Sequence, residues 1–270
     1  MTLQLDGFLS TDAPSDPTKL DQSLSPFSDL AARVNRFLVA LVKEPRDPPK
    51  SAAAELSITL MGRLVHDFAA TVLLANRGFR AQSRSMVRSA FETAIYCVAA
   101  CRDLVLDQGT NRRGTPTPFV AAFTGGHERF RLRVATELSA LAETTPEVKV
   151  RLLELAKELC DAGPVLDVNL EGLTQDLGLF DLYTVLYRPL SQDSHSSATS
   201  AGHHYQVDAA GQPRGFRIGP DYEQYGDTIL AAVAAVLLAS EGFIAKAGTS
   251  AEVASRSTLF ADYKVLAEQA

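Results

Sequence analysis

Residues 76–97 read NRGFRAQSRSMVRSAFETAIYC, and the fold of the whole chain can be built outward from them. After the glycine turn, apolar residues recur at the three- and four-residue spacing of a helix. We therefore expect one long helix, from about residue 79 to about residue 106, with a broad face in the core. The apolar residues of that face are Met86, Val87, Ala90, Phe91, Ala94 and Ile95.

A charged stripe runs along the same predicted helix. Arg84, Arg88 and Glu92 recur every four residues, so they project from one side, and Arg88 and Glu92 are spaced to pair directly. A buried charge is costly unless it is paired, so the stripe is either a structural ion network or part of a site. If it is a network, Glu92→Ala would leave a buried arginine without its ion-pair partner and lower the free energy of unfolding by about 3–5 kcal/mol.

Length and composition favour a globular helical protein. The chain has 270 residues, of which 46% are hydrophobic and 21% charged, and its formal net charge is −6. A chain of this length can bury a sizeable core as one domain. The negative net charge argues against a surface that coats nucleic acid, although a local basic groove is still open because four arginines cluster: Arg77, Arg80, Arg84 and Arg88.

Cysteine use and hydropathy indicate a cytoplasmic protein with no membrane partner. The three cysteines are an odd number, and Cys97 and Cys101 sit on one apolar helix face, which suits a reducing compartment. The N-terminus lacks a basic start followed by an apolar run. The longest apolar run, residues 229–239, is shorter than the roughly 20 residues of a membrane span.

Taken in order, the chain predicts a flexible N-terminal arm over residues 1–24 and a single domain over residues 25–270. The domain is an all-α bundle of about seven to nine helices with one minor β-hairpin near residues 204–218. We expect Asp47 to cap the second helix, Gly125 and Gly126 to interrupt the chain before the fourth, and Thr249 to open a capping box. The main helices are expected over residues 25–44, 50–74, 79–106, 127–142, 145–162 and 221–247, with a last one after 249.

A second informative segment, residues 181–195, reads DLYTVLYRPLSQDSH. If the segment is helical, Tyr183, Tyr187, Ser191 and His195 share one face. Pro189 removes a backbone donor and should kink that helix. A kink lined with polar groups is a candidate site.

Two resemblances involve these segments. The pairing of residues 88–92, RSAFE, with residues 187–195, YRPLSQDSH, resembles a broad family of uncharacterised, mostly bacterial, all-helical proteins known only as a domain of unknown function. The resemblance covers about residues 30–245. It implies an all-α fold and no particular activity.

More distantly, the second segment is similar to the HEPN helical domains. Their nuclease members carry an Arg, a polar residue and then four to six residues before a His; Arg188 and His195 have a compatible spacing, whereas Pro189 stands in the polar position. The resemblance implies metal-independent RNA cleavage, in which His195 moves the proton of the attacking 2′-hydroxyl and Arg188 neutralises charge on the phosphate. It also implies a homodimer.

Two other interpretations of the same residues stay open. If the second and third helices pack together, His66 could join the charged stripe, Tyr187 and His195, with Ser191 nearby, around a pocket for a small anionic ligand. Alternatively, His195 and Ser191 hydrogen-bond the Arg88 and Glu92 network and are only structural.

No metal or other cofactor is expected, because His195, His203, His204 and Asp193 match no standard zinc spacing. The sequence therefore predicts a bundle that binds a small anionic ligand or RNA, with a HEPN-like metal-independent ribonuclease of stress or phage defence as the alternative. Whether the protein is an enzyme stays open.

Overall fold

A computed structural model describes residues 22–44, 46–106, 116–161, 168–193, 202, 204–216 and 219–269. Backbone contacts divide the chain into two compact units: unit 1 holds Met1–Cys101 and Asp181–Ala270, and unit 2 holds Arg102–Phe180. The single domain expected over residues 25–270 stays a prediction. Of the expected N-terminal arm, residues 1–21 lie outside the described residues, and Gln22–Leu24 form a short 3₁₀ helix, η3.

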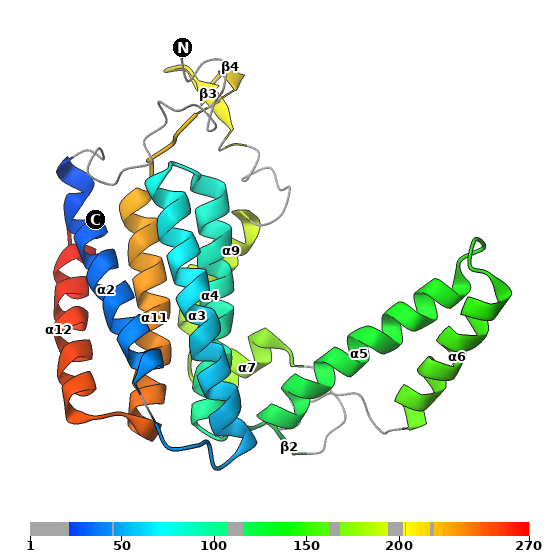
Figure 1. Ribbon diagram of the computed structural model, residues 1–270. Helices are drawn as coiled ribbons and strands as arrows, with labels where there is room; N and C mark the ends of the chain where they lie inside the picture. The colour runs from blue at the N-terminus through cyan, green and yellow to red at the C-terminus, as the bar shows by residue number, and fades with distance from the viewer. Residues whose placement is uncertain are drawn as a thin grey trace. The chain divides into compact units, whose positions relative to one another are not determined.

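Unit 1 is a helical bundle in which α4 packs against α3 and α11, and α11 also contacts α2 and α12. Figure 1 shows these five helices side by side. The predicted all-α fold with a small β-hairpin is confirmed. The elements of unit 1 are α2 (Ser25–Lys43), α3 (Ala52–Asn76), α4 (Arg80–Cys101), the π-helical turn η4 (Tyr183–Tyr187), α9 (Arg188–Asp193), β3 (Tyr205–Val207), β4 (Pro213–Phe216), α11 (Tyr225–Ala247) and α12 (Ser250–Ala267).

The expected apolar face of α4 forms much of the core. Five of its six residues are buried, and only Met86 is half-buried. Opposing residues come from helices far apart in the sequence: Leu64 and Phe68 of α3 are fully buried, as is Ile229 of α11. Burial of large side chains of this kind supplies most of the free energy that stabilises such a bundle.

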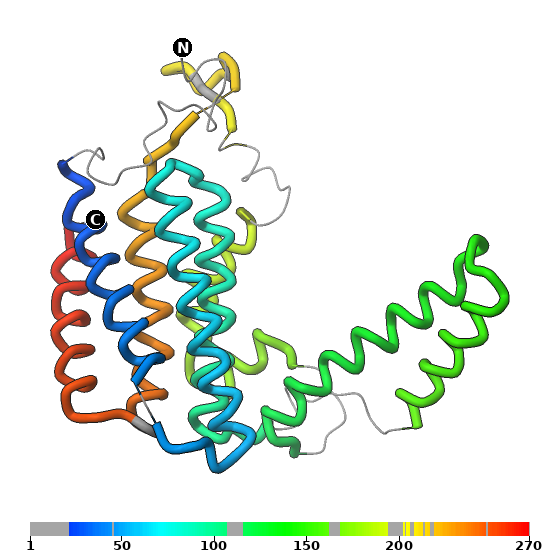
Figure 2. The backbone as a smooth tube through the Cα atoms, viewed as in Figure 1, coloured from blue at the N-terminus to red at the C-terminus, as the bar shows by residue number. Residues whose placement is uncertain are grey.

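Gly78 fixes the turn between α3 and α4, which run antiparallel in Figure 2. Its φ is +72°, and the N–H groups of Gly78 and Phe79 donate to the carbonyls of Ala75 and Leu74, both at 2.9 Å, in a Schellman motif. The Gly78 carbonyl also accepts from the backbone N–H of Asp221 at 2.9 Å. This turn therefore positions α4 against the segment that leads into α11.

Unit 2 contains an antiparallel helical hairpin, built from the two helices expected over residues 127–142 and 145–162. A five-residue connection joins α5 (Phe119–Ala140) to α6 (Pro146–Asp161), and the two helices pack along their length. The remaining elements are β1 (Val105–Leu106), paired antiparallel with β2 (Thr117–Pro118), and α7 (Leu170–Asp176); α8 (Phe180–Leu182) lies at the boundary of the units.

Four helix boundaries differ from the sequence-based expectation, and one of them is the start of α11, at Tyr225 and not near residue 221. The helix expected to reach residue 106 ends at Cys101, because Asp103 adopts a positive φ of 47° and the chain turns into β1. Gly125 and Gly126 do not interrupt α5, which runs through them from Phe119. Ser51, and not Asp47, caps α3: its hydroxyl accepts the N–H of Ala54 at 3.2 Å.

The other end signals are confirmed. Thr249 and Glu252 form the expected capping box at the start of α12, and β3 and β4 form the expected hairpin. In length and composition alone, α3 and α11 are apolar enough to cross a membrane, but a core helix passes the same test, and 67% of the α11 window is buried inside the structure. The cytoplasmic location stays a prediction.

Candidate functional site

The candidate site lies where α4 meets η4 and α9, all within unit 1. Four side chains form what we call the arginine–tyrosine stack: Arg188, Tyr183, Tyr187 and Arg88. The Arg188 Cζ lies 5.3 Å from the Tyr183 ring centroid, the two tyrosine rings stack with centroids 5.1 Å apart, and the Arg88 Cζ lies 5.2 Å from the Tyr187 ring. Cations are held over two aromatic faces.

The π-helical turn explains how the two tyrosines reach this arrangement. Pro189 has no N–H to donate, and its ring would clash with a carbonyl in the preceding helical turn. The chain accommodates it by a wider turn, in which the N–H of Arg188 donates to the carbonyl of Tyr183, five residues back. The disturbance expected at Pro189 is thus a π-helical turn, a feature that is frequent at functional sites.

Arg88 is linked to Glu92 through Tyr187 and not by the direct pairing that the sequence predicts. The Arg88 Nη2 donates to the Tyr187 hydroxyl at 2.9 Å, and that hydroxyl donates to the Glu92 Oε2 at 3.5 Å. Tyr96 donates to the other Glu92 oxygen at 3.2 Å. No carboxylate among the described residues forms an ion pair with Arg88, and its Nε is buried without a hydrogen-bond partner.

Tyr187 remains a neutral phenol over the physiological pH range. Burial, and after it the charge of Glu92, raises its pKa above the ordinary value, and the opposing effect of Arg88 is smaller. A protonated hydroxyl can accept from Arg88 and donate to Glu92 at the same time. This dual role requires that the proton stay on the phenol.

The neighbouring arginines of α4 are neutralised by carboxylates. Arg84 Nε lies 2.5 Å from the buried carboxylate of Asp193, which fixes the end of α9 against α4. Arg80 pairs with Asp221 at 3.3 Å and with Glu223 at 2.8 Å. Two of the four clustered arginines are therefore compensated, and of the three on α4 only Arg88 forms no ion pair among the described residues.

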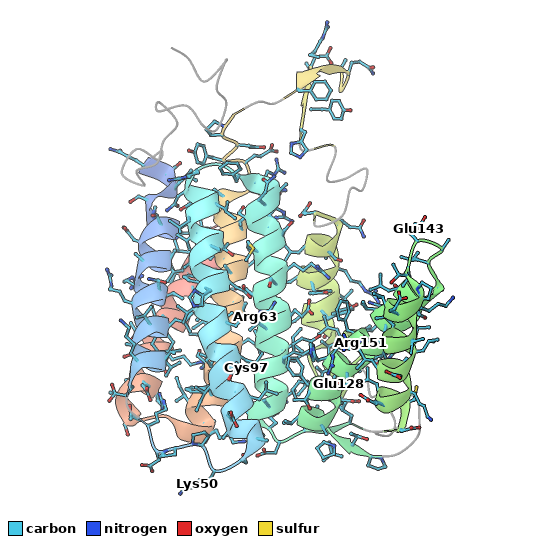
Figure 3. The ribbon with its side chains drawn as sticks, turned by 45° about the vertical axis from the view of Figure 1, so that its right-hand side comes forward. Lys50, Arg63, Cys97, Glu128, Glu143 and Arg151 are labelled. Atoms are coloured by element: carbon cyan, nitrogen blue, oxygen red, sulfur yellow. The ribbon has the colours of Figure 1, made fainter. Side chains whose placement is uncertain are left out.

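A second polar cluster on α4 faces α3. The buried Asp67 Oδ2 accepts from Ser89 at 3.0 Å and from Thr93 at 3.1 Å, and Arg63 lies 3.6 Å away. Figure 3 labels Arg63 on α3. Sequence reasoning selected the adjacent His66 instead, although Asp67 continues the buried Leu60 and Leu64 spacing and was therefore the better candidate for burial.

The structure separates the sequence-predicted site residues into three groups. It brings Arg84, Arg88, Glu92 and Tyr187 together on α4 and η4, with Ser191 half-buried on α9 and Arg188 exposed at its start. It leaves His66 exposed on α3, away from the polar cluster that Asp67 forms. The predictions for His195 and His203 lie outside the described residues, and within the part of the chain that is described no three His, Cys, Asp or Glu side chains gather to hold a metal.

The two segments that form the stack fall within one sequence family. A model of a family of unknown function, DUF5677, matches residues 54–213, more than half of the chain and the span from α3 to β4. No curated protein and no solved structure matches the chain.

Proposed function

Because the chain belongs to DUF5677, a family of unknown function, we propose a function from the site itself: the arginine–tyrosine stack binds a nucleotide unit, free or within single-stranded RNA. The observation that carries the proposal is the stack: Arg188 is exposed, and Arg88 forms no ion pair with any carboxylate among the described residues. Guanidinium and tyrosine planes stack on bases, and arginines bind phosphate.

The charge distribution supports this surface over the rest of α4. Arg80 and Arg84 already have carboxylate partners, so a phosphate would compete there with a fixed anion. Arg88 contacts a neutral phenol, and an incoming phosphate would add the missing charge partner. Each arginine lies over one ring of the stacked tyrosine pair, so base and phosphate groups could bind together.

The test compares three ligands by fluorescence anisotropy or by competition: a mixed-sequence RNA 12-mer, a mononucleotide and inorganic phosphate. Arg188→Ala should weaken RNA or nucleotide binding about 5- to 30-fold, from the roughly 1–2 kcal/mol of one stacking or phosphate contact. Lys264→Ala is the matched control, because it also removes one exposed cation 5.2 Å from a ring, on α12. Absence of binding by all three ligands, or equal effects of the two variants, would overturn the proposal.

Binding of RNA alone would indicate that several nucleotides are required, whereas equal binding of the mononucleotide would indicate a nucleotide pocket. Binding of inorganic phosphate alone would remove the stacked base from the proposal.

A second candidate is metal-independent RNA cleavage by Arg188 and His195. The observation that favours it is the fixed geometry of α9: Arg188 begins this helix, and the ion pair of Asp193 with Arg84 anchors its end, two residues before His195. RNA cleaved in EDTA by the wild type and not by His195→Ala, with RNA binding kept, would support catalysis. Equal cleavage by both proteins would exclude this role for His195.

A further inference from the structure

The α5–α6 hairpin of unit 2 carries an apolar surface that its own two helices leave uncovered. Of the large apolar side chains that are exposed in the described part of the chain, six lie between residues 130 and 153. Two packed helices alone enclose little core, so such hairpins are usually covered by further helices. The six are Phe130, Leu138, Leu141, Val148, Val150 and Leu153.

Part of this surface is a continuous stripe along α5. Phe130, Val134 and Leu138 follow one another at spacings of four residues, so they lie within about 80° around the helix axis, and Leu141 is the residue directly after the end of α5. Phe130 is 55% exposed, Leu138 42% and Leu141 50%, and Val134 is half-buried. The buried residues of the same helix half, Ala135 and Ser139, lie on a different side, so packing on α6 leaves what we call the α5 stripe open.

The charges around the stripe suit a second copy of the same helix. Arg133 and Glu137 lie on the same edge of the stripe, are 67% and 70% exposed, and reach each other only at 4.0 Å within one chain. In an antiparallel helix pair, equivalent edges face each other. A two-fold axis near Val134 and Ala135 therefore places Arg133 of one copy beside Glu137 of the other, and Phe130 across from Leu138.

The overall charge of the hairpin also favours self-association over an anionic partner. Residues 119–161 contain six Arg or Lys and seven Asp or Glu, and both signs occur on each helix; Figure 3 labels Glu128 on α5 and Arg151 on α6. A nucleic acid or an anionic membrane would instead require a basic face. A nearly neutral surface with an exposed apolar stripe promotes association between like molecules.

We propose that the α5 stripe is a homodimer interface, in which α5 pairs antiparallel with α5 of a second copy about a two-fold axis near Val134. An isologous pairing of this kind uses one patch twice. The contact is small, so we expect a dissociation constant on the order of micromolar.

The first test is the mass of the full chain by sedimentation equilibrium from about 5 to 200 µM. The wild type should approach twice the chain mass of 29.0 kDa. Val134→Asp should weaken the dimer at least 10-fold, whereas Val150→Asp should not, because Val150 is an equally simple apolar residue, 56% exposed, on the other helix. A monomeric wild type over the whole range, or equal dimerisation by Val134→Asp, would overturn the proposal.

The second test does not depend on a buried charge. In a Cys160→Ser background, Val134→Cys should cross-link to itself with oxidised glutathione, because the two-fold axis brings residue 134 of both copies together. Thr136→Cys, exposed on another side of α5, should not. Arg133→Glu should weaken the dimer, and adding Glu137→Arg should restore it. Equal cross-linking at residues 134 and 136 would exclude this pairing even if Val134→Asp failed to fold.

Discussion

Helix α4 carries two polar stripes, and they differ in how completely their hydrogen-bond donors are paired. On the side that faces α3, Ser89 and Thr93 both donate to the buried carboxylate of Asp67. On the side that faces η4 and α9, Arg88 contacts a phenol and a ring and keeps a buried Nε without a partner. The first stripe is hydrogen-bonded as a stable core requires, whereas in the second the Arg88 Nε makes no hydrogen bond among the described residues.

The comparison shows that a four-residue polar spacing does not identify a functional residue. Both stripes have this spacing, and both include charged or hydroxyl groups. What distinguishes them is whether each donor already has an acceptor and whether solvent reaches the site. Four experiments test this difference, and they follow in order of decreasing expected effect.

The largest effect is expected from Gly78→Ala, which should disturb both stripes because the Gly78 turn positions α4. The new Cβ would lie 2.6 Å from the Asp221 backbone nitrogen and from the Pro220 Cα, at a φ of +72°. Strain and displacement together should cost about 3–5 kcal/mol of unfolding free energy. Urea unfolding followed by circular dichroism measures this loss of unfolding free energy relative to the wild type.

Gly126→Ala is the matched control for that experiment, because a Cβ at Gly126 meets nothing within 4 Å and lies inside α5. It should leave stability unchanged or raise it by up to about 1 kcal/mol. Equal losses in the two variants would mean that the Gly78 turn has no special role.

Asp67→Ala should remove the acceptor that Ser89 and Thr93 share and should leave the arginine–tyrosine stack unchanged. The buried hydroxyl of Thr93 and the half-buried hydroxyl of Ser89 would lose their acceptor, so we expect a loss of about 2–4 kcal/mol in the free energy of unfolding. Ligand affinity at the arginine–tyrosine stack should stay within about twofold of the wild type, since the cluster around Asp67 makes no contact with it. Arg63→Ala, whose side chain is 62% exposed, should cost less than about 1 kcal/mol. A large fall in affinity would show that the two stripes are coupled.

Glu92→Ala should lower the free energy of unfolding by only about 1 kcal/mol. A direct ion pair between Arg88 and Glu92 would make this loss about 3–5 kcal/mol. Glu92 is half-buried and accepts two long hydrogen bonds, at 3.2 and 3.5 Å, from tyrosines. The Arg88 contact with Tyr187 does not require it. A loss above about 3 kcal/mol in urea unfolding would restore the buried ion-pair interpretation.

The smallest effect is a change in the pH dependence of stability. Because the pKa of Tyr187 is raised in the folded protein, the unfolded chain loses this proton first as the pH rises above about 10. Folding then takes up a proton, so stability falls with increasing pH. Tyr187→Phe should make the fall between pH 10 and 11 shallower than in the wild type, and Glu92→Gln should do so to a lesser extent. Identical slopes would contradict the role of the neutral phenol.

Much of the fold follows from the sequence because it depends on local periodicity. The buried faces of α2, α3 and α4, the hairpin of β3 and β4 and the Thr249 capping box all have patterns that act within one or two turns of chain. The end of α4 at Cys101 does not have such a pattern, since the apolar residues continue to Leu106, which is buried in a strand. The end of α4 therefore depends on how residues after Cys101 pack in the folded protein, which the local sequence pattern does not show.

The candidate site was predictable only in part. The four-residue spacing predicted that Arg84, Arg88 and Glu92 lie on one side of α4. Pro189 predicted an irregular helix in the second segment. Spacing could not indicate that Tyr187 would stand between Arg88 and Glu92, because that contact joins residues almost 100 positions apart. The choice between Asp67 and His66 was predictable, since Asp67 continues the spacing of the buried Leu60 and Leu64 on α3 and His66 does not.

The π-helical turn has a consequence for how the gene can vary. A π-helical turn contains one residue more than an α-helical path between the same points. Loss of a single codon among those of Tyr183–Tyr187 would therefore leave an α-helical turn between the same points, in which the Pro189 ring clashes with a carbonyl of the preceding turn. The connection between α5 and α6 should accept an added or lost residue far more readily, so indels in natural variants should concentrate there and spare η4.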